Sequence, residues 1–320
     1  MMKRLSKAIP FNRILWSFTA LLFACAVIPT SLMPFPVGHD TRFHILRLMN
    51  IASEMKLGNF LPAIYSFALN GLGYGSPLFY PDLFFYPFAA LHAWGVPVVT
   101  VFRLMQALMP AAIFFSMYFC AGALFRDRTQ AHLAALSYAF SFYAATDVFY
   151  RASIGECFGF IFLPIVYLGY HSILHHRPDR WWILAFGMTG ILYTHVLSVL
   201  LSVILLAVLA LSDARLWLKH PGKIRYCVYA AVLCLGLSCR VWLPMLEQLR
   251  QLSFRLNNDV HGVEAFLNSM YTPLRLLLPP IGATLLPGDA ELGLPRWTGL
   301  FGYLAMASCL MGADRQQRKS

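Results

Sequence analysis

Long apolar runs constrain this chain of 320 residues more than any other feature of its sequence. A helix needs about 20 mostly apolar residues to cross the hydrocarbon core of a bilayer. The candidate runs are 14–33, 97–125, 131–146, 157–174, 181–212, 226–245 and 297–312. Because only 12% of the residues are charged, a water-soluble enzyme could not cover its surface and is excluded. The runs predict an all-α, polytopic membrane helix bundle.

Two of the apolar stretches do not fit a single straight crossing. The run 181–212 would form a helix of about 48 Å, whereas the hydrocarbon core is about 30 Å thick. It is predicted to be a hairpin of two short helices that turns near 193–195. The stretch 81–94 is short and contains Pro81 and Pro87, so it is predicted to be interfacial or re-entrant. With these choices the chain crosses the membrane about eight times.

Lysine and arginine predict which ends of the spans face the cytoplasm. In the eight-span arrangement, the cytoplasmic segments contain 15 of the 25 Lys and Arg residues but only 4 of the 14 Asp and Glu residues. Such an excess of basic residues is typical of cytoplasmic loops, so both termini are predicted to be cytoplasmic. The net charge of +11 does not indicate nucleic-acid binding, because the basic residues lie between the apolar runs.

The long first loop, residues 34–96, is predicted to lie on the extracytoplasmic side. From Asp40 its pattern is helical. One face of that helix carries Asp40, His44, Arg47 and Glu54, and the other carries Ile45, Leu48, Met49, Ala52 and Met55. The pattern predicts an amphipathic helix that lies along the membrane surface and ends near Gly58. Asp40 is the N-cap of this helix or a carboxylate facing a cleft, and the two roles are compatible.

Further polar groups are predicted to reach the same side of the membrane. Glu156 forms a capping-box pattern with Ser153, and Arg151 either snorkels or binds a phosphate or carboxylate. His195, at the predicted hairpin tip, is an interior hydrogen-bonded group or takes part in the chemistry. Arg240 lies about one turn inside the outer end of its helix, where an unpaired cation is costly, so it is a functional candidate. Nucleotide-binding, zinc-protease and serine-hydrolase motifs do not occur.

Several short motifs carry a resemblance to known proteins. They are Gly38-His39-Asp40, Phe43-His44, Gly71-x-Gly73-Tyr74-Gly75-Ser76-Pro77, Tyr150-Arg151 with Gly155-Glu156, Thr194-His195 and Val241-Trp242-Leu243-Pro244. In them the chain resembles bacterial polytopic proteins of the YfhO-like group, which includes families labelled "6-pyruvoyl-tetrahydropterin synthase-related". That group looks like part of the C-type (GT-C) glycosyltransferase superfamily. Residues 1–247 are expected to form a GT-C-like membrane module, and 248–320 an outer loop, a last span and a basic cytoplasmic tail.

The resemblance implies transfer of a sugar, with inversion, from a polyprenyl-phosphate donor to an envelope glycan, lipid or protein on the outer face of the bacterial inner membrane. Asp40 would be the general base or, with Glu156, a ligand of a divalent cation such as Mg²⁺ or Mn²⁺. Arg151 is a candidate to hold the lipid phosphate. The other residues expected to bind substrate are His39, His44, His195 and Arg240. These residue types suit the reaction, because it needs a carboxylate to deprotonate the acceptor and cations to hold the leaving phosphate.

Two other functions stay open from the sequence. A lipid or solute transporter would use the same kind of bundle, although no clear inverted repeat or paired broken helices are seen in the sequence. A non-catalytic scaffold or truncated relative would fit an end at Ser320, soon after the last predicted span, since the superfamily usually has more spans and often a large C-terminal domain.

Overall fold

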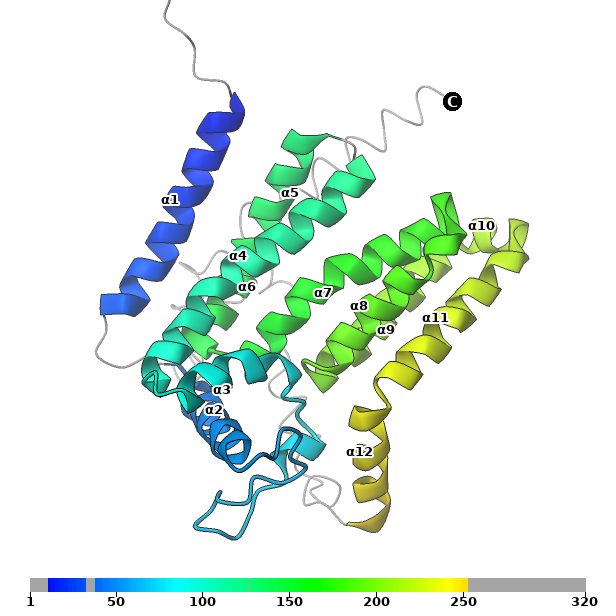
Figure 1. Cartoon of the computed structure of the whole chain (residues 1–320). Helices are drawn as coiled ribbons and strands as arrows, with labels where there is room; N and C mark the ends of the chain where they lie inside the picture. Colours follow the sequence, from blue (N-terminus) through cyan, green and yellow to red (C-terminus); the bar gives the residue numbers. More distant parts are fainter. Residues whose placement is uncertain (1–10, 33–37, 126, 253–320) are drawn as a thin grey trace, which may run out of the picture.

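The computed structural model describes residues 11–32, 38–125 and 127–252, and this part of the chain is mostly helical (Figure 1). The longer helices are α1 (Phe11–Leu32), α2 (Thr41–Lys56), α4 (Val98–Phe125), α5 (Arg128–Ala139), α7 (Ile154–His171), α8 (Trp182–Leu192), α9 (Val196–Ser212), α11 (Ile224–Leu237) and α12 (Cys239–Gln251). The short helical segments are η1 (Ser76–Leu78), η2 (Leu83–Phe85), α3 (Tyr86–Ala93), α6 (Phe142–Ala145), η3 (Thr146–Arg151), η4 (Ser172–His176), η5 (Pro178–Arg180), α10 (Ala214–Lys219) and η6 (Pro221–Lys223). Within the described ranges the extended pairing is a single isolated bridge, Tyr65 with Tyr74. The prediction of an all-α fold is confirmed for this part of the chain.

Two of the described helices are long and apolar enough to cross a membrane. They are Val98–Phe125, which is α4, and Ile154–His175, which continues α7 into η4. A third candidate is the pair Pro221–Leu237 and Cys239–Gln251, whose halves meet at a bend of 73°. The predicted run 226–245 is therefore not one straight helix.

Two other predicted runs differ from the structure or fall outside it. The run 131–146 is divided between α5 and α6 at Phe140 and Ser141. The Ser141 hydroxyl accepts a hydrogen bond from the Ala144 amide and so begins a new helix. The last run, 297–312, most of the loop before it and the basic tail lie outside the described residues.

The predicted break in the run 181–212 is confirmed. Residues 193–195 form a turn between α8 and α9, and Figure 1 shows both helices beside α7, running in opposite directions. Glycines let α7 and α8 approach closely, since a Cβ on Gly169 would meet the backbone nitrogen of Leu184 at 2.3 Å. Gly187 makes a similar approach to α7. The seam between α7 and α8 is thus packed backbone against backbone.

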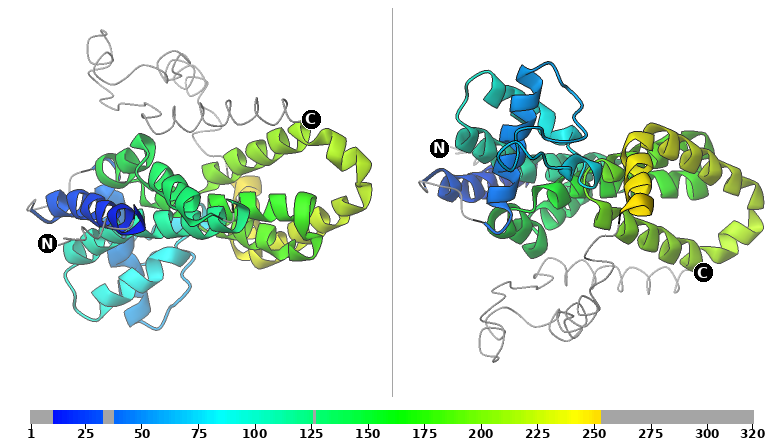
Figure 2. Two further views of the ribbon diagram at one scale, coloured as in Figure 1. Left: turned by 90° about the horizontal axis from the view of Figure 1, so that it is seen from above. Right: turned by 90° about the horizontal axis from the view of Figure 1, so that it is seen from below.

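The turns between helices gather at two opposite ends of the bundle (Figure 1). One end, here called the basic end, holds the α4–α5 junction, η5 and the segment α10–η6. The other end, called the site end, holds α2, α3, η3, the 193–195 turn and α12. Figure 2 shows the helices spread between α1 on one side and the α9–α11 region on the other. The stretch 81–94 lies at the site end as η2 and α3, which together form the apolar helix Leu83–Ala93. At 1.5 Å per residue this helix is about 16 Å long, which is shorter than the hydrocarbon core of about 30 Å.

Helix α2 begins after Asp40 as predicted and ends at Lys56. Two residues later, Gly58 has a left-handed φ of 81° and ends the helical conformation. Its polar face is not turned to water, as an amphipathic helix on a membrane surface would require. His44, Arg47 and Glu54, on the polar face, are only 0%, 1% and 2% exposed. The polar face is buried because partners in the segment 59–82 satisfy it.

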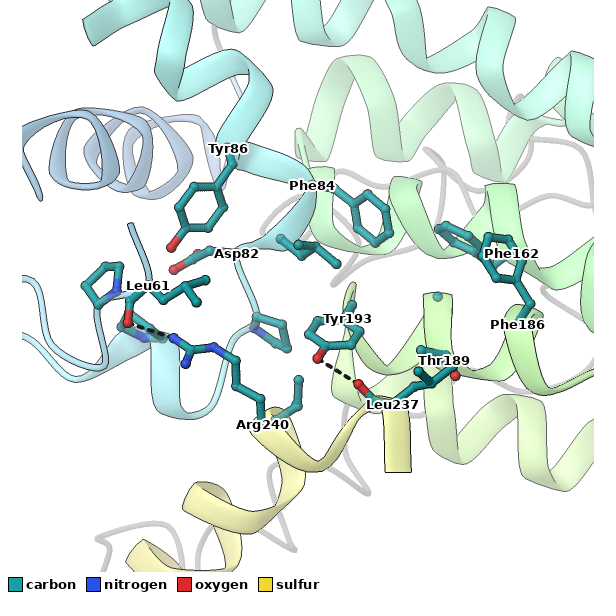
Figure 3. A pocket seen from close by; sticks show the side chains of 16 residues that line it. Leu61, Asp82, Phe84, Tyr86, Phe162, Phe186, Thr189, Tyr193, Leu237 and Arg240 are labelled. Atoms are coloured by element: carbon teal, nitrogen blue, oxygen red, sulfur yellow. Dashed lines mark hydrogen bonds between the residues drawn. The ribbon is translucent and has the colours of Figure 1, made fainter. Parts of the chain in front are cut away.

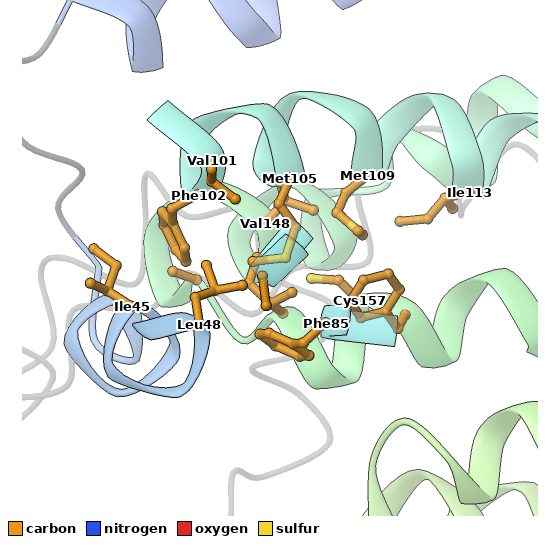
Figure 4. Packing of buried hydrophobic residues seen from close by; sticks show 14 of the residues in the cluster. Ile45, Leu48, Phe85, Val101, Phe102, Met105, Met109, Ile113, Val148 and Cys157 are labelled. Atoms are coloured by element: carbon orange, nitrogen blue, oxygen red, sulfur yellow. The ribbon is translucent and has the colours of Figure 1, made fainter. Parts of the chain in front are cut away.

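The apolar side of α2 contributes to the larger hydrophobic core. Figure 4 shows Ile45 and Leu48 of α2 facing Phe102 and Met105 of α4, with Phe85 of η2 beneath them. A second core joins α7, α8 and α11. The first core fixes the loop segments of the site end onto the bundle, and burial of each large side chain contributes about 1.5–3 kcal/mol.

Candidate functional site

A close backbone contact brings the start of α2 to the end of η3. The Asp40 amide donates a hydrogen bond to the Arg151 carbonyl oxygen at 2.9 Å. Gly38 permits this contact, because a Cβ there would meet the Ala152 Cβ at 2.8 Å and the Tyr150 carbonyl oxygen at 3.1 Å. The glycine of the Gly-His-Asp motif is therefore a steric requirement for having Asp40 and Arg151 side by side.

Asp40 occupies the N-cap position of α2, but its carboxylate makes no capping hydrogen bond. The side chain is half-buried. Its charge acts on two neighbouring groups, raising the pKa of both Tyr80 and His195 as one of several contributions. Because it makes no capping bond, the Asp40 carboxylate is left available for other contacts.

Arg151 holds two carboxylates together. Its guanidinium donates hydrogen bonds to Asp147, to Glu156 Oε2 at 3.0 Å and to the Tyr143 hydroxyl at 3.4 Å. Tyr143 in turn donates to Glu156 Oε1 at 2.5 Å. Both oxygens of Glu156 are therefore engaged, while Arg151 stays partly exposed, its side chain showing 29% of its surface.

Asp147 is the fully buried member of this group. Burial raises the pKa of Asp147 to about 8, the charge of Glu156 raises it further, and Arg151 opposes both effects. Its Oδ2 atom has no hydrogen-bond partner. Asp147 therefore binds a proton more readily than an exposed aspartate does.

Tyr80 connects this group to the rest of the site end. Its ring lies directly on Gly155 at the start of α7, where a Cβ would meet the tyrosine oxygen at 2.2 Å. The ring centroid is 5.7 Å from that of His195. Burial raises the pKa of Tyr80 to about 12, so it is a neutral hydrogen-bonding group. Burial also lowers the pKa of His195, which favours its neutral form. We name Asp40, Tyr80, Tyr143, Asp147, Arg151, Glu156 and His195 the polar cluster.

A buried ion pair between Arg47 and Asp82 contacts the polar cluster through the ring of Tyr80. Arg47 Nε donates to Asp82 Oδ1 at 3.0 Å, and the two side chains are only 1% and 4% exposed. Tyr65 donates to Asp82 Oδ2 at 2.5 Å. The guanidinium carbon lies 4.3 Å from the ring centroid of Tyr80 and 4.1 Å from that of Phe85. Arg47 thus fixes the Tyr80 ring from one side, while Gly155 receives it on the other.

A pocket of about 490 Å³ lies next to the polar cluster (Figure 3). Its walls are mostly apolar and come from η2, α7, α8 and the α11–α12 junction. The lining residues that Figure 3 labels are Leu61, Asp82, Phe84, Tyr86, Phe162, Phe186, Thr189, Tyr193, Leu237 and Arg240. Arg240 is the one cation among the residues that line it, and its guanidinium donates to the Leu61 carbonyl oxygen at 2.7 Å. The size and lining are those of a site for a small or elongated apolar ligand.

The pocket and the polar cluster share two segments of chain. In the segment 80–82, Tyr80 belongs to the cluster, whereas Pro81 and Asp82 line the pocket. In the turn 193–195, His195 belongs to the cluster, whereas Tyr193 lines the pocket and donates to the Leu237 carbonyl oxygen at 3.0 Å. The two features are therefore neighbours at the site end, divided by these segments.

The sequence-predicted site residues lie in four different environments. Asp40, Arg151, Glu156 and His195 come together in the polar cluster, whereas Arg240 lies in the pocket. His39 is exposed, with its ring centroid 5.3 Å from that of Tyr150.

His44 is a core residue stacked on Phe85 at 5.4 Å. Burial, together with the nearby Arg47, holds the pKa of His44 well below its usual range. It is therefore a neutral ring inside the protein, although its Nε2 atom has no hydrogen-bond partner.

Sequence reasoning missed Asp82, Asp147, Tyr65, Tyr80 and Tyr143 as site-end groups. One signal was present for Asp82, which is the single Asp, Glu, Lys or Arg residue between Lys56 and Arg103. A lone acid in so apolar a stretch is costly to bury without a cation. The tyrosines carried no comparable signal, because aromatic residues also form cores and interfacial belts.

Among the described residues, His, Cys, Asp and Glu side chains do not form a group of three or more that could hold a metal ion. Asp40 and Glu156 would supply two ligands, and Glu156 is already bound by Tyr143 and Arg151. The donors present therefore do not fit a divalent cation.

Comparison with known proteins gives one informative alignment. No family model matches the chain, and no solved structure matches it. It is 25% identical over 238 residues to an uncharacterized protein of Lactococcus lactis subsp. cremoris (strain MG1363). The alignment covers 70% of this chain but only 38% of that protein. The name of that relative states no activity, so function is inferred from the site.

Proposed function

We propose that this chain is a multi-pass protein of the bacterial inner membrane that transfers a sugar from a polyprenyl-phosphate donor, in the manner of C-type glycosyltransferases. The observation that carries the proposal is the meeting of Asp40, Arg151, Glu156 and His195 at one end of an apolar bundle, beside an apolar pocket. A lipid-linked donor requires both features, because its chain is apolar and its reacting end is charged.

The proposed topology has eight spans with both termini in the cytoplasm. It is supported by the distribution of charge along the helices, since Arg128, Arg177 and Arg180 lie at the basic end together with the segment α10–η6. Positive charge concentrates on the cytoplasmic side of membrane proteins. The site end then faces the extracytoplasmic side.

Four members of the cluster have a role in the proposed transfer. Asp40, free of any capping bond, is the general base that takes the proton of the acceptor hydroxyl. Arg151 holds the phosphate that leaves, because its guanidinium is partly exposed and charge-assisted hydrogen bonds to phosphate are strong. Glu156 orients Arg151, and His195 is a neutral hydrogen-bonding group beside Tyr80. No step runs through a metal ion.

The pocket is proposed to take the first part of the lipid chain. Phe84, Phe162 and Phe186 offer an apolar wall, and Arg240 stands at the edge where a second anionic oxygen can bind. The segments 80–82 and 193–195 then separate the chain from the reacting end.

The test is complementation of a strain that lacks the gene. Wild type, Asp40→Asn and, as a matched control, the exposed Asp179→Asn are expressed at equal levels in the membrane, and envelope glycans are compared by mass spectrometry. We expect glycans restored by wild type and by Asp179→Asn but lost with Asp40→Asn. If Asp40→Asn restores them fully, Asp40 is not the base and the catalytic proposal fails.

A transporter is the second candidate, and the bend between α11 and α12 favours it. Broken helices beside a ligand pocket are common in transporters. This alternative predicts substrate flux in proteoliposomes that survives Asp40→Asn. Flux that survives while transfer is absent would replace the first proposal.

A further inference from the structure

The loop between α2 and η2 is apolar and uncharged over an unusual length. Residues 57–81 contain no Asp, Glu, Lys, Arg or His. Many of their large side chains are exposed: Leu57, Phe60, Leu61, Ile64, Phe67, Leu69, Leu72 and Tyr74. Leu72, at the tip, is 88% exposed. A soluble loop would place polar residues at these positions, so this surface calls for an apolar neighbour.

The backbone of the same loop satisfies many of its own hydrogen bonds. Tyr65 and Tyr74 exchange two backbone hydrogen bonds, at 3.0 and 3.2 Å, and the amides of Gly71 and Gly73 both donate to the Ala68 carbonyl oxygen. Left-handed φ angles at Leu69, Asn70, Gly71 and Gly73 make this tight turn possible. Internal pairing of peptide groups lowers the cost of moving a loop into an environment with little water.

The loop is also anchored firmly at its base. Glu54 accepts hydrogen bonds from the Ser66 amide at 2.6 Å and from the Asn59 side chain at 2.8 Å, and Tyr65 is tied to Asp82. The exposed apolar side chains therefore belong to a loop whose conformation is fixed by hydrogen bonds at its base.

Helix α12 offers a second exposed apolar face at the same end. Its sequence places Trp242, Met245, Leu246, Leu249 and Leu252 on one side, and Arg240, Glu247, Gln248, Arg250 and Gln251 on the other. Leu246, Leu249 and Leu252 are exposed. The helix makes an angle of 73° with the preceding helix. With α11 along the bilayer normal, α12 would lie close to the membrane plane, which is the usual orientation of an amphipathic interfacial helix.

The loop and α12 are joined to each other. Arg240, in the first turn of α12, donates to the Leu61 carbonyl oxygen, and α12 also contacts η1 of the loop. Figure 1 shows α12 at the site end. We name residues 57–81 together with α12 the loop–α12 surface.

We propose that the loop–α12 surface is seated in the interfacial layer of the lipid bilayer, with Leu72 and the apolar face of α12 in contact with lipid. The proposal rests on the membrane location proposed above but not on sugar transfer. Lipid fits better than a protein partner, because residues 57–81 carry no charge that could select a partner and the charged residues of α12 lie on the side opposite its apolar face. Aromatic residues such as Phe60, Phe67 and Tyr74 are also typical of the interfacial layer.

The proposed interfacial position of the loop–α12 surface also determines where the neighbouring pocket lies. Leu61 and Arg240 belong both to the surface and to the pocket lining, so a surface at the lipid boundary puts the pocket entrance at the same depth. An amphiphile could then enter from the bilayer without passing through water.

The experiment is site-specific photo-cross-linking in intact membranes. The benzophenone amino acid p-benzoylphenylalanine replaces Leu72 in the full-length chain, and the probe is a phospholipid with an alkyne in its acyl chain. Leu108, exposed on the spanning helix α4, is the lipid-facing control, and Asp179 at the basic end is the aqueous control. Since all three positions are exposed, replacement is expected to leave folding intact, and membrane yield is measured for each.

We expect the phospholipid cross-link at position 72 to be comparable with that at 108 and at least about fivefold above that at 179. Cross-links from 72 to another part of this chain or to a second polypeptide, with no lipid adduct, would overturn the proposal in favour of a covered protein interface. The absence of any adduct at 72, with lipid captured at 108, would show that the loop stands in water. If 108 captures no lipid either, the membrane location itself fails, and this proposal fails with it.

Discussion

The buried pair Arg47–Asp82 gives the sharpest test of how the site end is held together. Both side chains are almost completely inaccessible, and Asp82 has a tyrosine hydroxyl as its other hydrogen-bond partner. Replacing Arg47 by Met keeps the apolar stem but leaves the Asp82 carboxylate without its cation. Breaking a buried pair by removing one partner costs about 3–5 kcal/mol, because an uncompensated charge remains. The cation–π contacts to Tyr80 and Phe85 are lost as well, and their share is included in that range.

The assay is unfolding in mixed micelles, with the free energy of unfolding measured as SDS is added. The chain contains a matched control in the exposed pair Arg177–Asp179, which is 3.2 Å apart with side chains 59% and 63% exposed. Arg177→Met is expected to cost no more than about 1 kcal/mol. The double variant Arg47→Met with Asp82→Leu should recover most of the loss, which gives a coupling energy of about 2–3 kcal/mol. An Arg47→Met variant as stable as Arg177→Met would refute the buried pair.

Three further substitutions give separate tests. Burial raises the pKa of Asp147 to about 8 from an unfolded value of about 3.9, so the folded state binds the proton more tightly than the unfolded state. The free energy of unfolding therefore falls as the pH rises from about 4 to 8. Asp147→Asn should flatten this slope when unfolding is measured across that pH range. Gly155→Ala places a Cβ against the Tyr80 oxygen and should cost about 1–3 kcal/mol by the same assay, whereas Gly222→Ala, with nothing within 4 Å, should change stability by less than about 0.5 kcal/mol. Glu54→Ala releases the base of the 57–81 loop, and hydrogen–deuterium exchange should speed up across that loop but not in α4.

Much of the architecture follows from length and apolar character alone. The limit of about 30 Å for one crossing predicted that the run 181–212 must break, and the turn lies at the residues expected. The start of α2 at Asp40 was also readable, because helical periodicity begins there. These features depend on neighbours in sequence, which a pattern records.

The buried polar contacts of α2 could not be predicted from the sequence, because they depend on residues that are distant along the chain. Helical periodicity separates two faces of α2, but it does not say which face meets protein. The sequence predicted an amphipathic helix along the membrane surface, but the polar face is buried in protein because Asp82, 35 positions after Arg47, supplies the counter-charge. Asp147 is different, because Arg151 lies only four positions after it, but its complete burial depends on the packing of η3 and could not be seen in the sequence.

The close glycine packing between α7 and α8 determines which walls of the pocket can move when a ligand binds. Two walls of the pocket belong to α7 and α8, whose backbones are already in contact, so these helices cannot move closer together. Another wall follows the bend at Ser238, a fully buried residue whose hydroxyl donates to the Cys234 carbonyl oxygen at 2.6 Å. We expect differently shaped ligands to be accommodated at this bend or in the segments 61–62 and 77–86, and a stiffer α11–α12 junction would narrow the range of molecules that bind.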